Sequence, residues 1–167
     1  MDIEKHSLAE THPHLADFAS LLHDLNKESE RGAVLISSAY IEGQLKKIIA
    51  SFLLRGAASK KLLDGFGAPL GTFAARATAA EALGLMSEDE YSDLAVIRKI
   101  RNDFAHNHRA TFSDEHIAQK CQLLKHSIKD TNARGQFTSA AVCLILNLTN
   151  RPHYVSKKRL NRETWPY

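Results

Sequence analysis

Apolar side chains recur every three or four residues along most of the chain, a spacing typical of amphipathic helices. The first such stretch covers residues 13–27 and opens on Pro13, a favourable first helical residue. Its apolar stripe consists of Leu15, Phe18, Leu22 and Leu25. The second runs from about Glu30 to Leu54, with Ser29 as its expected N-cap. Its apolar positions are Val34, Tyr40, Ile41, Leu45, Ile48 and Phe52.

Glycine separates this long helix from the next one. Residues 56–71 contain four glycines and Pro69, which predicts a loop. The Gly65-Phe66-Gly67 segment inside it lacks the spacing of a phosphate-binding loop, so turn glycines are the favoured interpretation.

Start and stop signals predict three more helices after this loop. Thr72 is the expected cap of an alanine-rich helix that Gly84 closes. Ser87 and Glu90 form a capping box, which begins a helix that reaches about His106. Its stripe consists of Leu94, Ile97, Ile100 and Phe104. Residues 113–114 begin the third, whose stripe consists of Ile117, Cys121, Leu124 and Ile128.

Residues 137–148 fit a helix by apolar spacing, although their β-branched content also permits a strand. We favour a helix because every other element is helical. The pattern therefore predicts an all-α fold: a single-domain helical bundle of about five to six helices with antiparallel packing. The domain is expected to cover residues 1–150.

Composition agrees with a folded cytoplasmic protein. The 167 residues are 44% hydrophobic and 25% charged, as in ordinary globular domains. No apolar stretch reaches the length of a membrane span, and the charged start lacks a secretory signal. The two cysteines lie in apolar surroundings, which suits buried thiols in a reducing compartment.

The net charge of +3 is concentrated at one end of the chain. Residues 151–167 hold five basic residues and one acidic residue, a net +4, so the other 150 residues sum to −1. We predict a basic, flexible C-terminal tail over residues 151–167. A near-neutral body argues against a broad nucleic-acid platform.

The tail itself is a candidate nucleic-acid tether, and the alternative is an ordinary solvated tail. Tyr154 and Trp165 could stack on bases in such a tether. Its candidate phosphate-binding residues are Lys157, Lys158, Arg159 and Arg162.

The segment from Arg98 to His108 carries the most chemistry in the chain. Arg101, Asn102 and His106 have the form Arg-Asn-x-x-x-His, which resembles the ribonuclease motif of the HEPN superfamily of small α-helical domains. That resemblance implies metal-independent cleavage of RNA. His106 would exchange protons with the attacking or leaving oxygen, Arg101 would stabilise the phosphorane, and Asn102 would orient the phosphate or the imidazole, with Arg98 in support.

Helical geometry restricts that hypothesis. Asn102 and His106 are about 40° apart around the axis, whereas Arg101 and His106 are about 140° apart. Arg101 falls on the side of Ile97 and Phe104, where an arginine usually pairs with a carboxylate, and Glu42 is one candidate. Within one regular helix Arg101 and His106 could converge only through the long arginine side chain or near a frayed helix end. A two-fold dimer is another route, with two copies of the motif lining one cleft, so any catalysis implies a dimer.

Other catalytic or metal patterns are lacking in the sequence. The paired histidines, His12 with His14 and His106 with His108, are two residues apart and share no helical face. No His-x-x-x-His, Cys-x-x-Cys or Gly-x-Ser-x-Gly pattern is present. We expect no metal and no cofactor.

Three segments together resemble the mannitol operon repressor family of bacterial cytosolic proteins. They are Arg-Gly-Ala-Val-Leu-Ile-Ser-Ser-Ala-Tyr-Ile-Glu at 31–42, Ala-Pro-Leu-Gly-Thr-Phe-Ala-Ala-Arg at 68–76 with Ala-Leu-Gly-Leu-Met at 82–86, and residues 91–106. The likeness spans roughly residues 28–130. It implies an all-helical transcriptional regulator of sugar-alcohol uptake or metabolism, a repressor without a recognisable DNA-binding motif.

Two hypotheses follow for function. In the first, a helical homodimer represses through a protein partner, at a groove formed by Arg31, Glu42, Arg76, Arg98 and Arg101. Solvated charges or structural salt bridges are the alternative interpretation of those five residues. In the second hypothesis, the chain is a ribonuclease or an RNA-binding domain that uses the Arg-Asn-x-x-x-His motif. RNA or DNA could thus be a partner, though through no known DNA-binding motif, and no membrane contact is expected.

Overall fold

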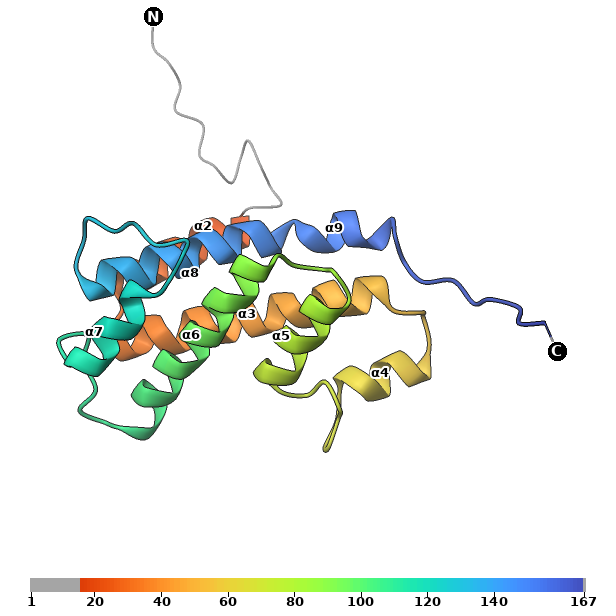
Figure 1. Ribbon diagram of the computed structural model, residues 1–167, viewed down its shortest axis with the longest axis horizontal. Coiled ribbons are helices and arrows are strands. Elements are labelled where there is room, and N and C mark those ends of the chain that lie inside the picture. Colours follow the sequence, from red (N-terminus) through yellow and green to blue (C-terminus); the bar gives the residue numbers. More distant parts are fainter. Residues whose placement is uncertain (1–15, 167) are drawn as a thin grey trace, which may run out of the picture.

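The computed structural model describes residues 16–166, which form eight helices and no strand (Figure 1). The central element is α3, Glu30–Phe52, a helix of 23 residues. Its N-cap Ser29 accepts a hydrogen bond from the Gly32 N–H at 3.0 Å. One side of α3 is fully buried, including Val34, Ile41 and Leu45. Six of the other seven helices in residues 16–166 contact α3, so it organises the bundle.

Those helices cover α3 from different sides (Figure 1). The C-terminal pair α8, Ala133–Thr149, and α9, Arg151–Ser156, runs along α3 together with α2, Ala16–Lys27. The pair α5, Phe73–Ala82, and α6, Glu88–His106, lies side by side across it. The short α4, Ala57–Leu63, packs on its C-terminal half, and α7, Glu115–Gln122, bridges α6 and α8.

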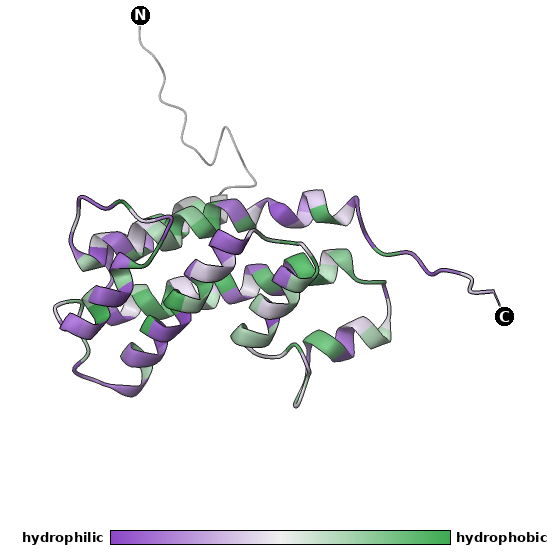
Figure 2. Cartoon of the chain, in the orientation of Figure 1, coloured by the Kyte–Doolittle hydropathy of each residue, from purple (hydrophilic) through white to green (hydrophobic). Residues whose placement is uncertain are grey.

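A continuous apolar core lies between these helices. Phe112 packs with tilted rings against Phe104 of α6 and Phe137 of α8, with ring centroids 5.0 and 5.4 Å apart. All three rings are at most 5% exposed. Hydrophobic and hydrophilic residues are mixed along the helices (Figure 2). None of the helices over the described part of the chain has the length and apolar character needed to cross a membrane.

The local signals in the sequence predicted most of this fold correctly. The all-α, single-domain prediction is confirmed, and residues 137–148 are helical within α8. Ser29 and Thr72 cap α3 and α5, and Ser87 with Glu90 forms the expected capping box of α6. Gly84 ends α5 with a positive φ of 66°. The expected start at Pro13 and Leu15 lies outside the described residues.

The number of helices was underestimated because two short ones were not predicted. Residues 56–71, interpreted as a loop, contain α4. The glycines of that segment lie outside the helix, and its seven residues are good helix formers apart from Ser59. The helix predicted to begin at residues 113–114 is shorter than expected. It ends at Gln122, and Ile128, the last residue of its predicted apolar stripe, is 64% exposed.

The predicted tail differs from the structure over its first ten residues. Arg151–Ser156 form α9, in which Val155 is buried. Farther on, Arg159 donates to the carbonyl oxygens of Ala50 and Leu53 at the end of α3, at 3.0 and 2.6 Å. The Leu160 N–H donates to the Phe52 carbonyl at 2.8 Å. The body therefore extends past residue 150. The mobility of the remainder, residues 161–166, stays a prediction.

Candidate functional site

A cleft of about 480 Å³ opens between α3, α5 and α6. It lies where the start of α5 faces the second half of α6, two elements that are neighbours in Figure 1. Its lining residues are Glu42 from α3, Gly71, Thr72, Phe73 and Ala74 at the start of α5, and Arg98, Arg101 and Asn102 from α6. Three of the five predicted binding residues thus meet in one cavity.

The two arginines of this cleft have no acidic partner among residues 16–166. Arg101 donates from Nη1 to Oδ1 of Asn102 at 3.1 Å, and Arg98 makes no hydrogen bond within the described chain. Arg101 is exposed, whereas Ile97 and Phe104 are fully buried. Helical spacing does place Arg101 on the side of Ile97, as expected, but its long side chain reaches solvent near the end of α6 and is not buried against a carboxylate.

Glu42 pairs with Arg76 and not with Arg101. The Arg76 Nη1 lies 3.1 Å from Glu42 Oε1, and its side chain is only 11% exposed. The same guanidinium donates to the carbonyl oxygens of Leu70 and Leu63, at 2.8 and 3.2 Å. Arg76 thus holds the connection between α4 and α5 against α3, which is a structural role.

Arg31 lies away from the cleft, at the C-terminal end of α6. Its guanidinium donates to the Phe104 carbonyl and, at 2.6 Å, to the Asn107 carbonyl. The Phe104 carbonyl is one of the acceptors that the end of α6 leaves without an intrahelical partner, and the Asn107 carbonyl also accepts the Ala110 N–H at 3.1 Å. The five residues predicted to form one groove therefore have different positions. Glu42, Arg98 and Arg101 line the cleft. Arg76 pairs with Glu42 without lining the cleft, and Arg31 caps the end of α6.

The Arg-Asn-x-x-x-His motif is also divided. Arg101 and Asn102 line the cleft, whereas His106, the last residue of α6, is exposed and does not line it. The cleft therefore holds two of the three residues that the motif requires.

The connection between α4 and α5 carries an exposed aromatic side chain, Phe66, at a point that we call the tip. Phe66 is completely exposed, between Gly65 and Gly67, whose φ angles of 105° and 71° favour glycine. The connection is the narrow loop below α4 and α5 in Figure 1. Sequence reasoning treated this segment only as a turn, although a phenylalanine between two glycines is a signal for an exposed tip.

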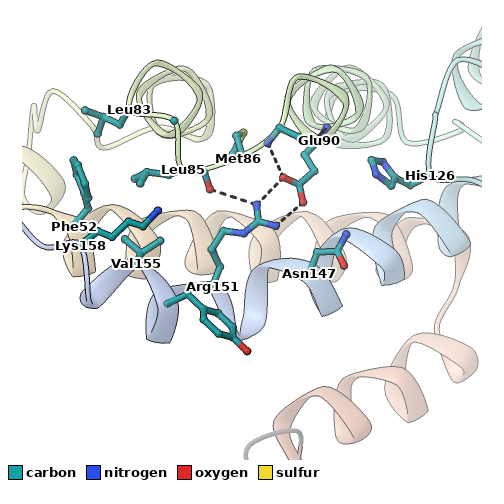
Figure 3. A pocket seen from close by; sticks show the side chains of 13 residues that line it. Phe52, Leu83, Leu85, Met86, Glu90, His126, Asn147, Arg151, Val155 and Lys158 are labelled. Atoms are coloured by element: carbon teal, nitrogen blue, oxygen red, sulfur yellow. Dashed lines mark hydrogen bonds and ion pairs between the residues drawn. The ribbon is translucent and has the colours of Figure 1, made fainter.

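A second cavity, of about 700 Å³, lies between the turn after α5 and the helices α6, α8 and α9 (Figure 3). Arg151 spans it and forms a two-pronged ion pair with Glu90, at 2.6 and 2.8 Å. Burial would raise the pKa of Glu90, but the Arg151 guanidinium and the Ser87 N–H outweigh it and hold that pKa below its ordinary value. Sequence reasoning missed this pair because Arg151 was assigned to the tail.

A second buried carboxylate lies farther along α6, at Asp93. It is fully buried and accepts the backbone N–H groups of Lys125 and His126 at 2.7 and 2.9 Å. Nδ1 of His126 lies 2.8 Å from the same carboxylate, and the imidazole lines the larger cavity (Figure 3). Asp93 thus holds the turn after α7 against α6.

The remaining predicted residues form no further cluster. In the tail, Lys157 lies 5.6 Å from the Tyr154 ring, and Lys158 lines the larger cavity. Arg162 and Trp165 are exposed.

Burial raises the pKa of Cys121 to about 12. Over residues 16–166, no three histidine, cysteine or acidic side chains are grouped as a metal site would require.

Comparison with known proteins shows similarity at the level of the fold. No protein-family profile matches the chain, and no curated protein matches it. Among solved structures, a chain from the X-ray structure of the MtlR–HPr complex of Escherichia coli is similar, with a TM-score of 0.60 and 19% sequence identity. The match covers 83% of this chain and 97% of that chain. This chain therefore has a fold similar to that of a chain in the MtlR–HPr complex.

Proposed function

We propose that the chain is a regulatory protein that acts through a protein partner. The observation that carries this proposal is the structural likeness to nearly the whole of a chain from a complex of two proteins. The resemblance of three segments to mannitol operon repressors points the same way. The proposed role is repression of sugar-alcohol metabolism in the bacterial cytoplasm, with a protein of the HPr type as the partner. Homodimerisation stays a prediction.

The proposal of a protein partner also agrees with the charges of the chain. Residues 1–150 sum to −1, and this part of the sequence contains no recognisable helix-turn-helix. A repressor of this kind would reach its target through another protein and not by direct contact with DNA phosphates.

The tip at Phe66 is the surface that we propose for the partner. Phe66 is completely exposed and therefore contributes nothing to the hydrophobic core of the chain. Aromatic side chains are enriched at protein interfaces. Leu62, 37% exposed, lies on the last turn of the adjoining α4. The loop is held in place by Arg76, so little loop entropy would be lost on binding.

Calorimetric titration of the full-length chain with HPr from the same organism tests this proposal. The wild-type chain should bind, and Phe66→Ala should weaken binding about tenfold or more, as for a residue at the centre of an interface. Because Phe66 is fully exposed, the free energy of unfolding of the variant should differ from that of the wild type by less than about 0.5 kcal/mol.

Leu123→Ala provides the matched control. Leu123 is also an exposed apolar residue, at 66%, but it follows α7. Its substitution should leave the affinity for HPr unchanged. A wild-type chain that does not bind HPr would contradict the proposed partner, and equal losses in the two variants would contradict the proposed surface.

A further inference from the structure

The cleft between α3, α5 and α6 carries an uncompensated positive charge. Arg98 and Arg101 both line it, and neither pairs with a carboxylate within residues 16–166. The one acidic residue in its lining, Glu42, is neutralised by Arg76 at 3.1 Å. The lining side chains with Arg76 therefore sum to +2, which suits a ligand with two negative charges.

The two arginines can converge on a single group. They are three residues apart on α6, a spacing that makes side chains neighbours on one helix face. The Asn102 amide lies beside them, with its oxygen accepting from Arg101 and its N–H groups unbonded within residues 16–166. Two guanidinium groups and an amide supply several donors to one site, and a tetrahedral phosphate can accept all of them.

The cleft also has room for more than a phosphate ion. Its volume of about 480 Å³ falls within the range of small-molecule sites. Phe73 and Ala74 form an apolar wall. The second carboxylate oxygen of Glu42 has no hydrogen-bond partner in the described residues, so it can accept from a ligand hydroxyl group.

We propose that this cleft binds a small phosphomonoester whose organic part carries hydroxyl groups. Arg98 and Arg101 bind the phosphate dianion, Asn102 donates to it, and Glu42 accepts from a hydroxyl. The positive end of the α5 helix adds to the attraction, although the arginine pair supplies the net charge. This inference goes beyond the proposed function, because it requires no protein partner.

Calorimetric titration of the full-length chain with glycerol phosphate, inorganic phosphate and glycerol tests the proposal at low ionic strength. Glycerol phosphate should bind most tightly, phosphate more weakly, and glycerol not at all. Arg98→Gln and Arg101→Gln keep the apolar stem of the side chain and should each weaken binding about tenfold or more. Lys99→Gln, an exposed position between them, should change the affinity by less than about twofold.

Three outcomes would overturn the proposal. They are no binding of glycerol phosphate by the wild-type chain, equal losses in all three variants, and tight arginine-dependent binding of an RNA oligonucleotide in place of the phosphomonoester. Phe66→Ala should bind glycerol phosphate like the wild type. Failure here would leave the HPr titration unaffected, so the two proposals are separable.

Discussion

Arg151 is the residue whose role differs most between sequence and structure. Its guanidinium neutralises Glu90, a carboxylate that is only 5% exposed. The two residues are 61 positions apart, so no local pattern connects them. The capping residues Ser29, Thr72 and Ser87 were predictable because each contacts the backbone three positions along. Capping hydrogen bonds between nearby residues can therefore be predicted from the sequence, whereas an ion pair between distant residues can be identified only once the packing of the helices is known.

The ion pair predicts a large effect for Arg151→Ala. Removal of Arg151 leaves a buried carboxylate uncompensated, so the free energy of unfolding at pH 7 should fall by about 3 kcal/mol. Urea denaturation measures this quantity. Lys157→Ala, at an exposed position beyond α9, should have an effect within about 0.5 kcal/mol.

The same pair predicts a dependence on pH. The pKa of Glu90 is lowered on folding from its ordinary value of 4.5, so its contribution to stability is present above that value and is lost as the pH falls through the folded pKa. The difference between the wild type and Arg151→Ala should therefore shrink in acid. An equal difference at pH 7 and at low pH would show that Glu90 is not the group involved.

Among the elements, α9 has the clearest effect on the boundaries of the fold. Sequence composition placed a domain boundary at residue 151, because basic residues accumulate there and apolar ones become scarce. The structure instead packs α9 against α3 and α8. The short α4 was missed for a comparable reason, since the glycines around it dominate the composition of that segment. Short helices are stabilised by tertiary contacts, which composition does not report.

Two truncated chains test the position of the boundary. A chain that ends at Leu160 should retain the melting temperature of the full-length chain, because residues 161–166 are exposed. A chain that ends at Asn150 loses the Arg151 ion pair, buried Val155 and the contacts of Arg159 and Leu160 with the end of α3. It should melt at a markedly lower temperature by differential scanning calorimetry. Equal melting temperatures for the two chains would restore the boundary at residue 151.

At the scale of the whole molecule, one stretch of chain joins the cleft to the tip at Phe66. The connection between α4 and α5 carries Phe66, and its continuation, residues 71–74, lines the cleft. Glu42, Arg98 and Arg101 were expected in one groove from the resemblance of their segments to one family, and all three line the cleft, whose binding role stays a prediction. Sequence reasoning could not separate the free arginines from the paired ones, since pairing depends on how α5 packs across α3.

Hydrogen exchange of the full-length chain, with and without HPr from the same organism, tests the central claim most directly. The regulatory proposal predicts that HPr slows amide exchange across residues 62–74, the segment that joins the tip to the cleft. Exchange in α7 and the turn that follows it should remain unchanged. Protection confined to α7 and that turn, or no protection by HPr anywhere in the chain, would contradict the account.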